Sequence, residues 1–356
     1  MVEKYLILKK KIIKNKKILI TGHTGFIGSW LTLYLSTFSN KIYGVSNLNG
    51  AKGGLFNLFK LNKKIKHFKF DLNNKKKTFK LIKKVKPDII IHLAAYPLVL
   101  ESYSKAETYI KNNFLITLNL LESIKSHKPE LFINFTSDKV YNIKNNFRKK
   151  ENDVLGVNDP YSFSKACSDN LTLLYSNISN NSKTKFINLR CGNIIGGGDW
   201  NKNRIIPDIM KSLFKKKKIY LRNPMSVRPW THIGEFLMCI VLILSKKINF
   251  DKYSAFNIGP KRNSEIKVVN LTKKIIKLSK YKNIKIIYKK NSLLETKILK
   301  LNSNKIFKKI QWVSKFNIDE KCKLTFDWYE DFFKKKNMSN IALNQIKLFE
   351  QKYFSK

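Results

Sequence analysis

Cysteine and long apolar runs are both scarce in this sequence, and each shortage excludes a class of protein. Only 4 of the 356 residues are cysteine, and no two are spaced as Cys-x-x-Cys. This excludes a disulfide framework and a zinc knuckle, and it predicts free, mostly buried thiols. The longest apolar run, Phe236 to Leu244, is far shorter than the about 20 residues of a membrane helix. Residues 1–17 carry no cleavable signal pattern, so we expect a cytoplasmic protein.

Acidic residues and arginine are also few. The chain has 71 Lys+Arg against 24 Asp+Glu, a formal net charge of +47, which by itself would indicate nucleic acid or an anionic membrane as the partner. Only 6 of the 71 basic residues are arginine, and the lysines are spread along most segments instead of gathering in one stripe with aromatics. We therefore expect a solvated basic surface that attracts small anionic substrates, with no nucleic acid and no membrane as partner.

What is present is apolar material in an alternating order. Hydrophobic residues make up 43% and aromatics 12%, enough for a core and too much for disorder. Short apolar runs alternate with helical patterns, which predicts parallel β-α-β units and a doubly wound α/β sheet of the Rossmann type. The predicted strands are 17–20, 42–45, 67–70, 89–93, 131–135 and 185–189, and the predicted helices are 26–35, 77–86, 104–125 and 161–178.

The composition changes after residue 190. From Cys191 onward glycine, asparagine, proline and arginine increase, followed by short mixed elements and a lysine-rich end. We expect a Rossmann domain over 17–190, a smaller substrate-binding lobe over 191–335 in which the chain returns to the sheet, and a helical tail over 336–356.

Three glycines lie between the first predicted strand and the first predicted helix. The segment 21–28 reads Thr-Gly-His-Thr-Gly-Phe-Ile-Gly. Such glycines permit a tight turn, the approach of backbone N–H groups to a pyrophosphate and close helix–strand packing, and the helix N-terminus favours the anion. A dinucleotide site is predicted here. The end of the second strand, where an acid would bind the adenosine ribose, carries Ser46 and Asn47, which leaves NAD versus NADP open.

A hydroxyl, a carboxyl, an amine and a phenol are predicted at neighbouring strand ends. Tyr161 and Lys165 are four residues apart on a predicted helix and share one face. The ammonium is expected to lower the pKa of the tyrosine toward that of a general base. Ser137, Asp138 and Lys139 follow a strand, so all five side chains are expected where doubly wound sheets bind ligands.

Four of the six arginines fall in two glycine- or proline-rich stretches. Arg190 and Arg204 flank the first, and Arg222 and Arg228 lie within seven residues of each other in the second. An arginine in a lysine-rich chain suggests a bidentate phosphate contact, with a structural ion pair as the alternative. His92 lies in an apolar strand and is interpreted as a core histidine. No spacing of histidine and carboxylates suggests a metal.

Six motifs together resemble the extended short-chain dehydrogenase/reductases that act on nucleotide sugars, and within them the CDP-glucose 4,6-dehydratase branch. They occur in the same order and spacing between about Lys17 and Tyr329: TGHTGFIGSWL, IIIHLAAYPLV, NFTSDKVY, DPYSFSKACSD, RCGNIIGGGDW and RNPMSVRPWTH. Most sugar-nucleotide dehydratases carry Asp-Glu where this chain has Asp138-Lys139, and the CDP-glucose branch resembles this chain in having Asp-Lys.

The resemblance implies NAD in the Rossmann lobe, a nucleotide sugar in the second lobe and a homodimer packed through two helices per subunit. The cofactor residues it implies are Gly22, His23, Thr24, Gly25, Phe26, Ile27, Gly28, Asp71, Leu72, Leu93, Ala94, Ala95, Tyr161 and Lys165. The catalytic residues are Ser137, Asp138, Lys139, Tyr161 and Lys165, and the substrate residues are Asn193, Arg204 and Arg228.

The implied reaction converts CDP-glucose to CDP-4-keto-6-deoxyglucose: oxidation at C4 by NAD, elimination of water across C5 and C6, and hydride return to C6. Whether Lys139 removes the C5 proton or acts electrostatically stays open. A 4-epimerase is the first alternative, and it should lack an acid beside Ser137. A non-catalytic basic Rossmann protein that binds RNA is the second; the presence of Ser137, Asp138, Tyr161 and Lys165 argues against it.

Overall fold

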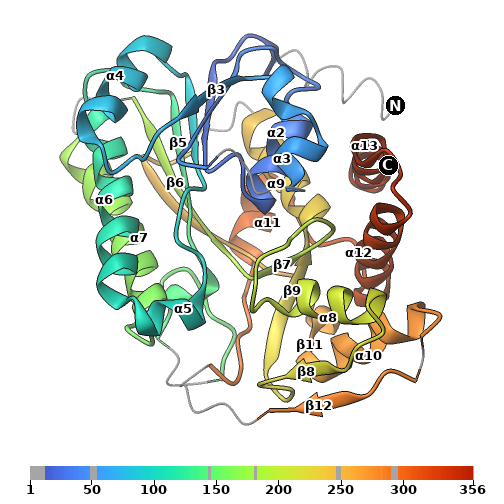
Figure 1. Cartoon of the computed structure of the whole chain (residues 1–356). Helices are drawn as coiled ribbons and strands as arrows, with labels where there is room; N and C mark the ends of the chain where they lie inside the picture. Colours follow the sequence, from blue (N-terminus) through green and yellow to red (C-terminus); the bar gives the residue numbers. More distant parts are fainter. Residues whose placement is uncertain are drawn as a thin grey trace.

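Seven parallel strands form the central sheet of the computed structural model, which describes residues 13–48, 54–142, 146–179, 183–245, 250–281, 283–289 and 296–355. The strand order is β10-β6-β5-β4-β1-β2-β3, the doubly wound order with a switch point between β1 and β4 (Figure 1). The predicted fold class is confirmed. The strands are β1 Ile18–Thr21, β2 Ile42–Ser46, β3 Lys66–Lys69, β4 Ile89–His92, β5 Leu131–Phe135, β6 Lys185–Cys191 and β10 Tyr253–Ile258.

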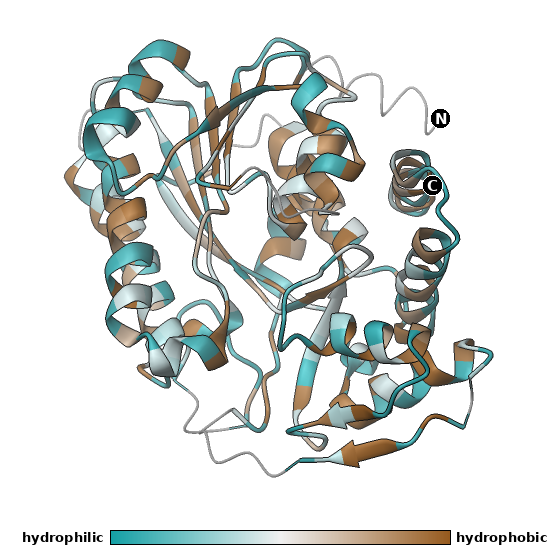
Figure 2. Ribbon diagram, viewed as in Figure 1, coloured by the Kyte–Doolittle hydropathy of each residue, from teal (hydrophilic) through white to brown (hydrophobic). Residues whose placement is uncertain are grey.

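Side chains that alternate along the strands divide the core into two layers. Leu19 and Ile90 contribute to one buried cluster, and Ile18 and Ile20 contribute to the other. Helices α4 (Lys75–Val85), α6 (Ala106–Ile124) and α7 (Pro160–Ile178) cover the first face. Helices α2 (Phe26–Leu35), α9 (Ile233–Ser245) and α11 (Asn304–Ile310) cover the second. In Figure 2 the strands are mostly hydrophobic, whereas the outer helices are mixed.

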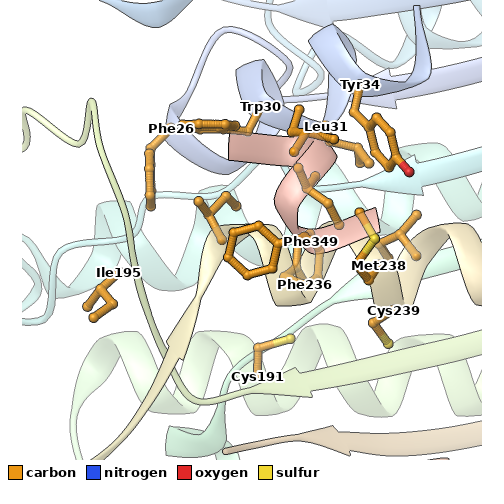
Figure 3. Close-up of a cluster of buried hydrophobic side chains, with 14 of the residues drawn as sticks. Phe26, Trp30, Leu31, Tyr34, Cys191, Ile195, Phe236, Met238, Cys239 and Phe349 are labelled. Carbon is orange, nitrogen blue, oxygen red and sulfur yellow. The ribbon is translucent and has the colours of Figure 1, made fainter. Parts of the chain in front are cut away.

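The apolar run at residues 236–244 lies inside α9, all of whose residues are buried. Figure 3 shows Phe236 of α9 near Phe349 of α13 (Met338–Phe354), with Trp30 and Leu31 of α2 nearby. A Cβ on Gly234 would lie 2.3 Å from the Phe349 ring, so the two helices are in close contact. This run is therefore a central core helix. Within the described part of the chain, no helix is long and apolar enough to cross a bilayer.

The second lobe is built from short strands and helices after residue 191 (lower right of Figure 1). Strands β7 (Asn193–Ile195), β9 (Val227–His232) and β11 (Glu265–Lys267) form one small sheet, and β8 (Ile219–Leu221) and β12 (Ile286–Tyr288) form another. Lys321 of α12 (Ile318–Phe333) is completely buried, pairs with Glu235 of α9 at 3.0 Å and donates to the carbonyl of Trp230 in β9. This contact joins the lobe to the core.

Most predicted elements lie within a few residues of the observed ones. The helix predicted over 104–125 is α6. A short helix that was not predicted, α5 (Val99–Ser104), precedes it, and Lys105 with its non-helical angles (φ −131°, ψ 42°) separates the two. Helix α7 begins as predicted, with the Asp159 side chain accepting the N–H of Ser162 and Pro160 at the first position. The other elements are α3 Leu55–Leu58, η1 Leu61–Lys63, α5 Val99–Ser104, η2 Asp138–Val140, α8 Ile205–Phe214, η3 Arg262–Ser264 and α10 Val268–Leu278.

Candidate active site

The glycine loop between β1 and α2 is shaped as a cradle that side chains would fill. Gly22 has φ +70°, which favours glycine, and a Cβ there would lie 2.7 Å from the backbone nitrogen of Ala94. A Cβ on Gly28 would lie 2.2 Å from the carbonyl oxygen of Gly22. Glycine at positions 22 and 28 therefore lets the loop pack closely against the start of α2 and the residues that follow β4. These features fit the pyrophosphate of a dinucleotide.

The neighbouring strand ends contribute neutral groups to the adenosine side of this cradle. Ser46 Oγ lies 2.8 Å from Thr24 Oγ1, and Asn47 donates to Asp71 Oδ2 at 3.3 Å. The other oxygen, Asp71 Oδ1, accepts the N–H of Asn73, which orients the carboxylate at the end of β3. The predicted cofactor residues at 71–72 and 93–95 all lie at the carboxyl ends of β3 and β4.

Two predicted cofactor residues have side chains that point into the protein. The His23 ring is completely buried and lies 2.8 Å from His67 Nδ1, and burial together with His67 lowers its pKa to about 4. Phe26 belongs to the core cluster. Only the backbone of these two residues is available to a phosphate. His92 is the core histidine expected: it contacts Thr21 and Thr117, and burial lowers its pKa to about 3.

One cavity at the carboxyl ends of β5 and β6 brings the catalytic and substrate residues together. Those that line it are Ser137, Asp138, Lys139, Tyr161, Asn193, Arg204 and Arg228. Parallel strands end at one edge, so residues far apart in sequence meet here. Lys165 lies behind this wall, where its Nζ donates to the carbonyl of Phe135 at 2.7 Å.

Asp138 is a buried acid with spare hydrogen-bonding capacity. Ser137 Oγ donates to Asp138 Oδ1 at 3.1 Å, while Oδ2 has no hydrogen-bond partner among the described residues. Burial raises the pKa of Asp138, and the positive charge of Lys139 opposes this rise. A carboxyl whose pKa is raised in this way is suited to deliver a proton to a leaving group.

Tyr161 and Lys165 lie one turn apart on α7, but their electrostatics differ from the prediction. Burial raises the pKa of Tyr161 to about 12, and the groups that oppose the rise are Arg204 and a hydrogen bond with Ser137. Burial lowers the pKa of Lys165 to about 8. The prediction that Lys165 lowers the pKa of Tyr161 is therefore wrong, because the effect of burial on this pKa outweighs that of the nearby charges.

The arginines divide into cavity-lining and structural ones. Arg204 lies 3.3 Å from Asp199, and Arg228 donates to the carbonyl of Val227 at 3.0 Å; both line the cavity. Arg190 forms two hydrogen bonds with Asp169, both side chains being buried. Its guanidinium is occupied structurally, so of the two alternatives left open by the sequence the structural ion pair holds for Arg190.

Asp208 of α8 and Tyr220 of β8 are among the cavity-lining residues that sequence reasoning missed. A signal existed for Asp208, since an acid is unusual in a segment as basic as 200–222. Tyr220 carries no such signal, because a tyrosine in a short strand is common. Among the described residues, no group of three or more histidine, cysteine or acidic side chains is placed to hold a metal.

The chain belongs to the NAD-dependent epimerase/dehydratase family, whose family model matches residues 18–259. It is 30% identical over 350 residues to the CDP-glucose 4,6-dehydratase of Salmonella typhimurium, covering 95% of this chain and 97% of the relative. It is 25% identical to the UDP-glucose 4-epimerase of Mycoplasma genitalium, covering 89% and 97%. The predicted resemblance is confirmed, and the cofactor is NAD.

Solved structures share the fold. The UDP-glucose 4-epimerase of Thermotoga maritima superposes with a TM-score of 0.79 at 20% identity, covering 89% of this chain and 99% of that one. A dTDP-glucose 4,6-dehydratase from Bacillus anthracis, in complex with NAD, superposes with a TM-score of 0.75 at 24% identity, covering 90% and 99%. The chain is thus an enzyme of a family that contains nucleotide-sugar 4,6-dehydratases and 4-epimerases.

Proposed function

We propose that the protein is a CDP-glucose 4,6-dehydratase that forms CDP-4-keto-6-deoxyglucose. The observation that carries the proposal is the buried Asp138 beside Ser137 and Lys139, in the same cavity as Tyr161. A 4-epimerase moves a proton and a hydride at C4 only, and has no use for an acid that protonates a leaving hydroxide. The 30% identity to the Salmonella dehydratase over nearly the whole chain supports the same substrate.

The first step is removal of the C4 hydroxyl proton by Tyr161. The positive charge of Arg204 and the hydrogen bond with Ser137 both favour the phenolate against desolvation. Lys165, on the same face of α7 as Tyr161, donates to the carbonyl of Phe135 at the end of β5 and would reach the ribose of NAD. Bound NAD supplies a hydride acceptor at C4 and later the donor to C6.

The elimination of water would use Asp138 and Lys139. Asp138, whose pKa is raised by burial, would give its proton to the hydroxide leaving C6 through Oδ2, which has no hydrogen-bond partner among the described residues. The C4 ketone makes the C5 proton acidic, and Lys139 takes that proton or stabilises the resulting enolate. Asn193, Arg204 and Arg228 line the same cavity and would hold the nucleotide diphosphate.

The organisation expected from the sequence is retained as part of the proposal. We propose a Rossmann domain over 17–190, a nucleotide-sugar lobe over 191–335 and a tail over 336–356, in a cytoplasmic homodimer. The insertion of β10 into the main sheet beside β6 supports a chain that returns to the first lobe from within the second. The tail contains α13, which packs on α9.

The test is a substrate panel. Purified NAD-loaded protein is incubated with CDP-, UDP-, dTDP- and GDP-glucose, and products are separated by mass and identified by NMR. We expect loss of 18 mass units and a 4-keto-6-deoxy sugar from CDP-glucose, and none with Tyr161→Phe. Formation of a 4-epimer of the same mass would establish the epimerase instead. RNA binding that weakens with salt, without turnover of any sugar nucleotide, would establish the non-catalytic alternative.

A further inference from the structure

The cavity continues past the catalytic residues to a second wall made by α8 and β8. Asp208 in the first turn of α8 and Tyr220 in the middle of β8 both line this wall. Neither residue has a part in the proton transfers or in the diphosphate contacts described above. A half-buried carboxyl and an aromatic ring therefore line the same cavity with no assigned role.

The position of Arg204 indicates the order in which the sugar, the diphosphate and the nucleoside of the substrate would lie along the cavity. Its charge acts on Tyr161, so it lies near the reacting sugar, and its carbonyl accepts the N–H of Asp208 at 3.1 Å. Asp208 is thus one helical turn farther along α8, a rise of about 5.4 Å. With the sugar at Tyr161 and the diphosphate at Arg204, the nucleoside of the substrate extends toward Asp208 and Tyr220.

The carboxyl of Asp208 is available to a ligand. It makes no hydrogen bond or ion pair with another described residue. Burial raises its pKa, while the positive charges of Arg222 and Lys211 act in the opposite direction and favour the ionised form. Arg222 itself is held by the side chain and carbonyl of Asn203.

Tyr220 offers a ring for stacking. Its side chain is half-exposed, and the ammonium of Lys289 lies 4.5 Å from the ring centroid. A cation placed over an aromatic ring holds the ring's position. Planar nucleobases of any identity can stack on such a ring.

We propose that Asp208 selects the nucleobase of the substrate: its carboxylate accepts a hydrogen bond from the N4 amino group of cytosine, on a base stacked against Tyr220. Uracil and thymine present a carbonyl oxygen at that position, which a carboxylate repels. The inference rests on the proposed function for the identity of the substrate as a sugar nucleotide. It deepens that function by assigning the choice of CDP over UDP and dTDP to one side chain.

The experiment measures binding of nucleoside diphosphates without sugar, so that it is independent of turnover. CDP, UDP and dTDP are titrated calorimetrically into NAD-saturated protein, with Asp208→Asn as the variant and Asp251→Asn, an exposed acid outside the cavity, as the matched control. We expect wild type and the control to bind CDP at least tenfold more tightly than UDP. Asp208→Asn should bring the two affinities within threefold, because a carboxamide offers both a donor and an acceptor.

A second variant, Tyr220→Leu, should weaken the binding of CDP and of UDP by the same factor, at least fivefold, and leave the ratio of the two affinities unchanged. The proposal is overturned if wild type shows no preference for CDP, if Asp208→Asn keeps the preference, or if Tyr220→Leu binds both as wild type does. Failure of the proposed function looks different. A protein that selects CDP through Asp208 but forms no 4-keto-6-deoxy sugar keeps this inference and loses that function.

Discussion

Ser137 Oγ donates a hydrogen bond to Asp138 Oδ1 at 3.1 Å, and the second oxygen of this buried carboxyl has no hydrogen-bond partner in the described part of the chain. Ser137 is also hydrogen-bonded to Tyr161. The serine therefore touches both the proposed base of the first step and the proposed acid of the second. In the proposed reaction the two half-reactions are adjacent in space but use different proton carriers.

Asp138→Asn and Lys139→Met should separate these half-reactions. Each variant keeps Tyr161 and Lys165, so oxidation at C4 should still occur. Water should not leave in Asp138→Asn, because asparagine has no proton of suitable acidity to give, nor in Lys139→Met, because methionine can neither take the C5 proton nor stabilise the enolate. Reduced cofactor should then accumulate, measured as absorbance near 340 nm, an order-of-magnitude larger than in wild type. A variant that retains cofactor and substrate yet forms no reduced cofactor would assign its residue to the first step.

Arg204→Ala and Arg228→Ala should weaken substrate binding. A charge-assisted hydrogen bond contributes about 1.5–3 kcal/mol, so KM for the sugar nucleotide should rise roughly tenfold to over a hundredfold. The matched control is Arg262→Ala, since Arg262 is exposed and lies outside the cavity. Steady-state kinetics checks this, and folded variants with wild-type KM would mean that the two arginines are structural.

The protein should retain NAD through purification. The hydride must stay on the enzyme between two steps, so loss of cofactor in mid-reaction would leave the enzyme inactive. Ser46 and Asn47 are neutral groups suited to ribose hydroxyls, and Asn47→Arg should move the preference toward NADP by supplying a partner for its 2′-phosphate. Chromatography of cofactor released by denaturation checks the first point. Release of NADP from wild type would contradict it.

The fold could be predicted from the sequence because its signals are local. Apolar runs of four to seven residues, such as Ile89–His92, recur between helical patterns, and this alternation specifies a parallel sheet without any knowledge of distant contacts. The glycine loop was readable for the same reason, since Gly22 and Gly28 are needed by a turn between consecutive elements.

The electrostatics of the site could not be read in this way. The pKa of Tyr161 depends on how deeply the folded chain buries the phenol, and the Lys165 spacing alone suggested the opposite direction. The role of Arg190 stayed open between an anion contact and an ion pair, because its partner Asp169 comes from another element and is brought to it only by folding. Asp208 was missed because its place in the cavity becomes visible only when α8 is folded beside the ends of β5 and β6.

Acid should destabilise the protein in a specific range. His92 and His232 have pKa values lowered to about 3, and His23 to about 4, in each case mainly by burial. Between these values and 6.5 the unfolded chain binds more protons than the folded one, so the free energy of unfolding falls as pH falls. Each histidine contributes about 1.4 kcal/mol per pH unit well below 6.5.

Denaturant unfolding of wild type and His92→Asn at pH 7, 6, 5 and 4.5 measures this contribution. The asparagine can keep one of the two threonine contacts of His92 but cannot titrate. The variant should be less stable at pH 7 and should lose stability less steeply below pH 6, with a slope smaller by about 1.4 kcal/mol per pH unit. Equal slopes would show that His92 does not resist protonation.

The proposed homodimer should depend on the outer face of α7. Phe163, Leu174 and Ile178 are 36%, 50% and 53% exposed, and their spacing of 11 and 4 residues places them on one side of the helix. Leu174→Glu with Ile178→Glu would put two charges into an apolar contact and should convert the dimer to a monomer, as measured by light scattering after size-exclusion chromatography. Leu348→Glu on α13, where the side chain is 48% exposed, is the matched control and should remain dimeric. A monomeric wild type, or a double variant that stays dimeric, would show that this face is not the interface.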